Sequence, residues 1–296
     1  MKNTKLLFPM FSLYECDKME KYLQKKAENG WMLEAIGFGW KFKRIAPAKL
    51  AFSVNYFPKA SEFDSCVSDD QLRFLDYCEH GGWNLCAQTA QMKVFYSENE
   101  NPVPIETDPV LEIDNIHRTI KKGYLPVWIM WIVISVLNIF TNTMKVFTDS
   151  YEYPSKYTNV LFLIFYVLLL IFWGQQLFRY LFWHKKAKDE AQTYGSFYIP
   201  KDDTAFKVTI LSSIFCIFAV WVWSIFDKYT AVFLAVTFFD VAAILGSVYG
   251  IKSIMKKLGA SAKVNQTVTI VGSVLISLII TSITTVFTII IIGLPA

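Results

Sequence analysis

The sequence lacks the motifs that mark common catalytic and nucleotide-binding sites. It has no glycine-rich phosphate loop, no G-x-G-x-x-G turn, no H-E-x-x-H helix and no G-x-S-x-G elbow. Only three histidines are present, which leaves few imidazoles for metal binding or proton transfer. We therefore expect no enzymatic activity, no cofactor and no metal site.

Charged residues are also scarce, and they are distributed unevenly. They make up 18% of the chain, against 54% hydrophobic residues, a balance too apolar for an ordinary soluble protein of this size. Residues 1–116 hold 13 Lys/Arg and 17 Asp/Glu, whereas residues 117–296 hold 16 Lys/Arg and 8 Asp/Glu. The first part is thus acidic and shows no basic stripe, so we expect no direct binding of nucleic acid.

Cysteine usage and the first residues both indicate a cytoplasmic start. The five cysteines show no C-x-x-C spacing, and their odd number favours free thiols over a disulfide framework. The N-terminus is polar and leads into a short apolar run that contains Pro9 and has no small-residue cleavage site after it. That pattern does not fit a secretory signal peptide, and we expect the N-terminal domain to stay in the cytoplasm.

The first hundred residues alternate strand-like and helix-like patterns, and part of the pattern occurs twice. At an offset of 52 residues, an apolar helix ends in glycine and is followed by tryptophan and a strand, giving the pairs Leu23/Leu75, Gly30/Gly82, Trp31/Trp83 and Leu33/Leu85. This predicts an α+β domain: a two-layer sandwich of two helices on an antiparallel sheet, with a pseudo-two-fold repeat.

The repeated Gly-Trp pair has two interpretations. In the first it is architectural: glycine takes a positive φ at the helix end, and the tryptophan packs beneath the returning helix. In the second, a groove between the two halves accepts a ligand or peptide, and it is lined by Trp31, Trp40, Trp83 and Phe95. The architectural interpretation is favoured, because a domain of this size needs aromatic residues in its core.

Three segments follow from these patterns. Residues 1–98 form the cytoplasmic domain, residues 99–123 an acidic, proline-containing linker with a juxtamembrane segment, and residues 124–296 an all-α transmembrane bundle. About five apolar stretches are long enough to cross a bilayer: 124–141, 159–183, 206–226, 230–251 and 267–292.

The cations between these stretches predict the orientation. Thirteen Lys/Arg lie on one side of the membrane and only Lys145, Lys156 and Lys228 on the other. By the positive-inside rule the protein is a multi-pass cell-membrane protein with a cytoplasmic N-terminus and an extracellular C-terminus. The cytoplasmic cations either only set this topology or also bind anionic lipid headgroups; the main ones are Arg118, Lys121, Lys122, Lys185, Lys186, Lys188, Lys252, Lys256 and Lys257.

One carboxylate falls midway along an apolar stretch. Asp240 costs on the order of 3 kcal/mol at that depth and should face the bundle interior, where Ser277 and Thr281 of the last stretch offer partners. It either bridges helices by a hydrogen bond, which we favour, or it carries protons or ions. The second interpretation would make the protein a transport-related one.

The N-terminal residues resemble a family of Gram-positive bacterial proteins, the domain-of-unknown-function family 2812. The resemblance spans about residues 6–96, and it rests on the helix end with Met19-Glu20, Leu23, Ala27 and Gly30-Trp31 together with the later Gly82-Trp83. Such proteins are often encoded beside PadR-type regulators, so the resemblance implies a membrane-associated role in regulation or stress response, and no enzymatic residues.

Taken together, these patterns lead us to expect a membrane-anchored regulatory or sensory protein. Its cytoplasmic α+β domain would bind a protein partner or a small ligand, with a functional link to a PadR-type regulator, and the bilayer would be its other partner. The alternative is a transport-related protein that uses Asp240.

Overall fold

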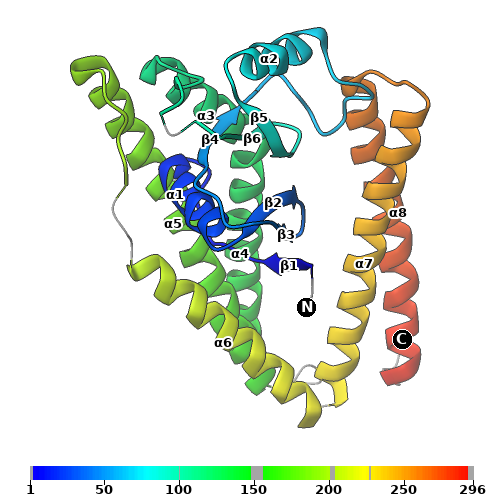
Figure 1. The fold of residues 1–296 in the computed structure, drawn as a ribbon. Coiled ribbons are helices and arrows are strands. Elements are labelled where there is room, and N and C mark those ends of the chain that lie inside the picture. Colours follow the sequence, from blue (N-terminus) through cyan, green and yellow to red (C-terminus); the bar gives the residue numbers. More distant parts are fainter. Residues whose placement is uncertain (1–2, 100, 148–155, 201–203, 227, 293–296) are drawn as a thin grey trace. The chain divides into compact units, whose positions relative to one another are not determined.

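The computed structural model (Figure 1) describes residues 3–99, 101–147, 156–200, 204–226 and 228–292. These residues divide into two compact units. The first unit holds residues 3–125 together with residues 180–200. The second holds residues 126–179 and 204–292. Neither unit is one continuous segment, because a long helix, Lys156–Tyr194, begins in the second unit and ends in the first.

The first unit begins with two copies of one strand–helix–strand–strand arrangement. The first copy consists of β1 (Thr4–Leu7), α1 (Cys16–Glu28), β2 (Trp31–Ile36) and β3 (Trp40–Arg44), and the second of β4 (Ala51–Tyr56), α2 (Asp69–His80), β5 (Asn84–Gln88) and β6 (Met92–Ser97). Each copy makes its own three-stranded antiparallel sheet, in the orders β1-β3-β2 and β4-β6-β5. The α+β class is confirmed. The prediction of a single antiparallel sheet is wrong, because the strands pair as two three-stranded sheets.

The internal repeat extends to backbone details. Gly30 and Gly82 have φ of +76° and +80°, so both helices end in a left-handed residue that favours glycine. A Cβ on Gly30 would also lie 2.9 Å from the carbonyl oxygen of Ile45. The register of β2 shifts after Leu33 and that of β5 after Leu85, again 52 residues apart. The two halves therefore share a local geometry as well as a sequence pattern.

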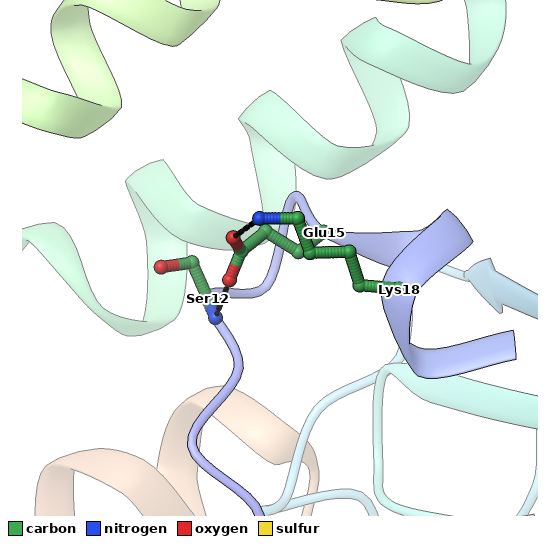
Figure 2. Close-up of polar contacts among 3 residues, drawn as sticks. All are labelled: Ser12, Glu15 and Lys18. Atoms are coloured by element: carbon green, nitrogen blue, oxygen red, sulfur yellow. Dashed lines mark hydrogen bonds and ion pairs between the residues drawn. The ribbon is translucent and has the colours of Figure 1, made fainter. Parts of the chain in front are cut away.

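Helix α1 supplies much of the core of this unit. Its buried residues, Cys16, Met19, Leu23 and Ala27, recur every three or four positions and so lie on one face. Before the helix, the Glu15 carboxylate accepts hydrogen bonds from the Ser12 backbone N–H at 2.7 Å and from the Lys18 ammonium at 2.9 Å, as Figure 2 shows. Glu15 thus ties the first turn to the chain before it, which fixes the direction in which α1 starts.

The remaining elements are helices: α3 (Pro109–Gly123), α4 (Leu125–Phe147), α5 (Lys156–Tyr194), α6 (Thr204–Phe226), α7 (Lys228–Lys257) and α8 (Ala262–Ile292). Four of them contain stretches long and apolar enough to cross a membrane, in α4, α5, α7 and α8. In α6 the apolar run among described side chains, Val208–Ala219, is shorter than a span, so the span at 206–226 stays a prediction.

Helix α5 is much longer than a bilayer requires. Its 39 residues extend over about 59 Å at 1.5 Å per residue, whereas the hydrocarbon core is about 30 Å thick. The charged residues Lys185, Lys186, Lys188, Asp189 and Glu190 lie near its C-terminal end. The apolar part of α5 is therefore long enough by itself to cross a membrane.

Candidate functional site around helix α3

Helix α3 lies at the centre of the candidate site, and its sequence explains where it starts and which face it buries. The Asp108 carboxylate caps it by accepting from the Val110 N–H at 2.9 Å, and Pro109 occupies the first turn. Ile113, Ile116 and Ile120 are at most 3% exposed and share one face of the helix. The segment that the sequence predicted as linker and juxtamembrane region thus forms part of the folded unit.

The end of α5 joins α3 through an aromatic cluster. The Tyr180 hydroxyl and His117 Nδ1 are hydrogen-bonded at 2.7 Å, and the rings of His117 and His184 stack with centroids 4.0 Å apart. Burial lowers the pKa of His117, and the nearby Lys121 lowers it further. The imidazole is therefore mostly neutral at neutral pH, which suits a close stack with a second imidazole.

A second contact connects α5 to the segment before α1. Tyr14 and Trp183 stack with ring centroids 4.7 Å apart, and each is at most 2% exposed. Along α5 the buried positions continue at Ala187 and Ala191, which repeats the spacing of an amphipathic helix face. The last turns of α5 are thus an integral part of the first unit's core.

Two buried carboxyl groups lie where α1 and α3 approach β4. The Glu20 carboxylate accepts from the Val54 N–H at 2.8 Å, and since β4 is an edge strand, this satisfies a donor that no neighbouring strand reaches. Burial, together with the smaller effect of the Asp17 charge, raises the pKa of Glu20 to about 8 and that of Glu112 to about 7, although the bond from Val54 opposes the shift of Glu20. Both groups therefore change protonation near neutral pH.

A cavity of about 480 Å³ opens beside the last turn of α3. It is lined by Pro58 and by four cationic residues, Lys59, Arg118, Lys121 and Lys122. Three of these cations were singled out from the sequence as topology or headgroup residues. Lys59 belongs to the segment after β4. It was not singled out from the sequence, because only the fold brings it to α3.

The structure distributes the four residues of the predicted aromatic groove over both sheets. Trp83 and Phe95 lie together in a buried cluster with Cys78, and the Trp83 indole N–H donates to the Val103 carbonyl at 2.8 Å. Trp31 lies on the first sheet, with the Arg44 guanidinium 5.0 Å from its ring centroid. Trp40 lies there too, beside the rings of Phe11 and Tyr22. A ligand groove formed by these residues stays a prediction.

The structure pairs Asp240 with a residue one turn beyond those expected. Its Oδ2 accepts from the Thr284 hydroxyl at 3.2 Å, a bond that links α7 to α8. Thr281 lies one helical turn before Thr284, and its carbonyl also accepts from the Thr284 hydroxyl, at 3.2 Å. Ser277 lies a further turn away on the same helix. This geometry fits a residue that bridges helices.

The other predicted cations lie at helix ends. Lys252, Lys256 and Lys257 are in the C-terminal part of α7, where positive charge complements the helix dipole. Lys185, Lys186 and Lys188 lie on the part of α5 that belongs to the first unit, and the Lys186 ammonium is 4.8 Å from the Phe182 ring centroid. Within the described parts of the chain, no group of three or more His, Cys, Asp and Glu residues could hold a metal ion.

Sequence reasoning missed six residues of this region: Glu20, Glu112, His117, Tyr180 and His184 at or near α3, and Tyr14, which stacks on Trp183 of α5. The two glutamates had a sequence signal, because each lies next to an apolar residue of a buried helix face. Glu20 follows Met19, and Glu112 precedes Ile113. For the others none existed, since positions 14, 117 and 180 are far apart in the chain.

Comparison with known proteins now places the N-terminal part of the chain. Residues 15–128 match the family model described as "Protein of unknown function (DUF2812)". This part of the chain is similar to that family. The match covers α1 to α3 and the start of α4, so α3 lies inside the matched region. No curated protein and no solved structure matches the chain.

Proposed function

We propose that this chain is a membrane-anchored regulatory protein whose cytoplasmic domain binds a protein partner along strand β1. The observation that carries the proposal is an exposed apolar patch on and around that strand. Leu6, Phe8, Met10 and Phe38 are 53%, 56%, 65% and 96% exposed. Contiguous exposed apolar side chains of this kind mark interaction surfaces.

The shape of the patch favours a partner segment in extended conformation. Strand β1 is at the edge of its sheet, so one row of its backbone N–H and C=O groups has no neighbouring strand. The rings of Phe8 and Phe38 contact edge to face with centroids 5.5 Å apart, beside that open edge. An added strand would pair with β1 and cover both rings, as in other cases of strand addition. The exposed Lys5 and Lys43 favour an acidic segment.

Helix α5 supplies the regulatory part of the proposal. Its first two-thirds is apolar and its last turns are buried in the α+β unit through Tyr180 and Trp183. Helix α5 begins in the second unit and ends in the first, and we propose that its last turns relay to the domain a change along its apolar part. We infer a cytoplasmic N-terminus and extracellular C-terminus from the distribution of cations, which places the patch in the cytoplasm.

Site-specific photo-crosslinking in cells tests this function. A photoreactive residue at Phe38 should give a defined adduct, and one at the exposed Glu79 on α2 should not. Phe8→Asp should remove the Phe38 adduct and reproduce the phenotype of a gene deletion while the protein accumulates normally. A PadR-type regulator is the first candidate to identify in the adduct. A Phe8→Asp protein with wild-type adducts and phenotype would refute the proposal.

The transport-related alternative rests on Asp240 and its bond to Thr284. A carboxylate among apolar helices is a standard element of proton and ion pathways. This alternative predicts that Asp240→Asn abolishes function at normal abundance, whereas the regulatory proposal predicts that it does not.

A further inference from the structure

We propose that the cavity beside α3 binds a phosphate group, as carried by an anionic lipid headgroup or a free phosphate ester. The site goes beyond partner binding on β1 and is independent of it. It consists of Lys59, Arg118, Lys121 and Lys122 around a cavity of about 480 Å³.

The convergence of two chain segments distinguishes this site from cations that only set topology. Arg118, Lys121 and Lys122 belong to α3, and cations near a helix C-terminus are favourable without any ligand. Lys59 comes from the segment between β4 and α2, and neither the helix dipole nor the positive-inside rule accounts for its position there. Carboxylates pair with Lys59 and Arg118, and an anion in the hollow would further reduce the repulsion among the four positive side chains.

The existing ion pairs at the cavity are weak enough to rearrange. The Lys59 ammonium contacts the Asp70 carboxylate at 2.7 Å, and the Arg118 guanidinium contacts that of Asp114 at 2.8 Å. All four side chains are well exposed, between 42% and 74%, and exposed pairs contribute only about 0–1 kcal/mol. Lys121 and Lys122 add two further charges. Burial lowers the pKa of His117 most, and the charges of Lys121, Lys188 and Arg118 lower it too, against the opposite effect of Asp114.

The position of these cations in the chain favours a lipid headgroup over a free phosphate ester as the source of the phosphate. Lys121 and Lys122 are three or four residues before Leu125, where the apolar stretch of α4 begins. At 1.5 Å per residue this separation is about 5–6 Å, within the depth of the headgroup region. Tyr124 lies between Lys122 and Leu125 in the chain, and tyrosine is enriched at membrane–water interfaces. A phosphodiester would accept hydrogen bonds from ammonium and guanidinium groups alike.

Native mass spectrometry of the full chain in detergent tests the proposal. Phosphatidylglycerol and phosphatidylcholine are titrated into wild type, into the pair Lys59→Gln with Lys121→Gln, and into the matched pair Lys256→Gln with Lys257→Gln at the end of α7. We expect one phosphatidylglycerol held at least tenfold more tightly than phosphatidylcholine. The first pair should weaken it at least tenfold, and the second less than twofold. Lys59→Arg should retain binding.

Equal weakening by both pairs, or equal affinity for the two lipids and no binding of phosphate, would overturn the proposal. A second arm identifies the source by adding glycerol phosphate or inorganic phosphate at millimolar concentration. Displacement of the lipid shows that both occupy the same site. If the protein binds soluble phosphate with the same dependence on Lys59 and Lys121 but holds no lipid, the source is the free phosphate. Each variant should unfold thermally at the same midpoint temperature as the wild type, which shows that the substitutions leave the fold intact.

Discussion

Replacing Glu20 by glutamine should make the domain more stable at alkaline pH and leave it unchanged in acid. Below its ordinary pKa of 4.5 the carboxyl is protonated in both the folded and unfolded chain. As pH rises, the unfolded chain ionises first, whereas the folded carboxyl stays protonated until about pH 8. The stability that Glu20 contributes is therefore fully present below pH 4.5 and is lost as pH rises toward 8.

The size of the effect follows from the same values. One pKa unit corresponds to about 1.4 kcal/mol, so ionisation of Glu20 lowers the free energy of unfolding by about 3 kcal/mol between pH 5 and pH 8. Glutamine does not ionise, and its amide oxygen can still accept from the Val54 N–H, a bond of 2.8 Å in the wild type. The difference between Glu20→Gln and wild type should thus be below about 1 kcal/mol at pH 5 and grow by about 3 kcal/mol up to pH 8.

Urea unfolding of the full chain in detergent, followed by pulse proteolysis, measures this difference. Glu79→Gln on the exposed side of α2 removes the same charge at the surface and serves as the control for loss of a surface charge. Glu20→Leu leaves the Val54 N–H without an acceptor and should cost about 1–3 kcal/mol at pH 5. If Glu20→Gln and wild type differ equally at pH 5 and pH 8, the carboxyl is not held in its neutral form and the reasoning fails.

Three further predictions concern the core, the membrane helices and the topology. Trp83→Ala should lower the free energy of unfolding by about 3–5 kcal/mol, because the ring is only 5% exposed and its hydrogen bond to Val103 is lost. Trp31→Ala should lower it less, because Trp31 is half-buried. Equal losses for the two variants in urea unfolding would contradict this. Asp240→Asn should keep wild-type abundance and function, and Asp240→Leu should lose about 0.6–2 kcal/mol of helix–helix stability; an abundant but inactive Asn variant in a deletion-complementation assay would support transport instead. A cysteine at position 227 should react with an impermeant thiol reagent added outside cells and one at Lys188 should not, and the reverse pattern would invert the topology.

Several features of the fold could be predicted from the sequence because they depend on local patterns. Long apolar stretches need only composition and length, and four of them are present in the structure as helices of sufficient length. The 52-residue repeat was visible because a helix that ends in glycine before a tryptophan has a fixed local order, with Gly30 and Gly82 both at positive φ. The resemblance to DUF2812 rests on the same residues and is confirmed for residues 15–128.

The pairing of strands was decided only by the tertiary structure. Alternating apolar residues predict that a segment is a strand, but they do not choose its neighbour, since the pleat is the same in one six-stranded sheet and in two three-stranded ones. Trp31 and Trp83 hold equivalent places in the repeat, yet one contacts cations at the surface and the other fills a core. Local pattern could not separate these environments, because burial depends on what packs over each sheet.

The residues of the candidate site were decided in the same way. Tyr14, His117 and Tyr180 carry no local signal, and they meet only because the last turns of α5 return to the domain that begins the chain. Lys59 joins the cations of α3 for the same reason. Charge, hydropathy and repeats are properties of neighbouring residues, so the sequence by itself determined the apolar stretches of α4, α5, α7 and α8, the α+β class and the resemblance to DUF2812. Contacts between residues far apart in the chain depend on packing, which only the folded chain defines.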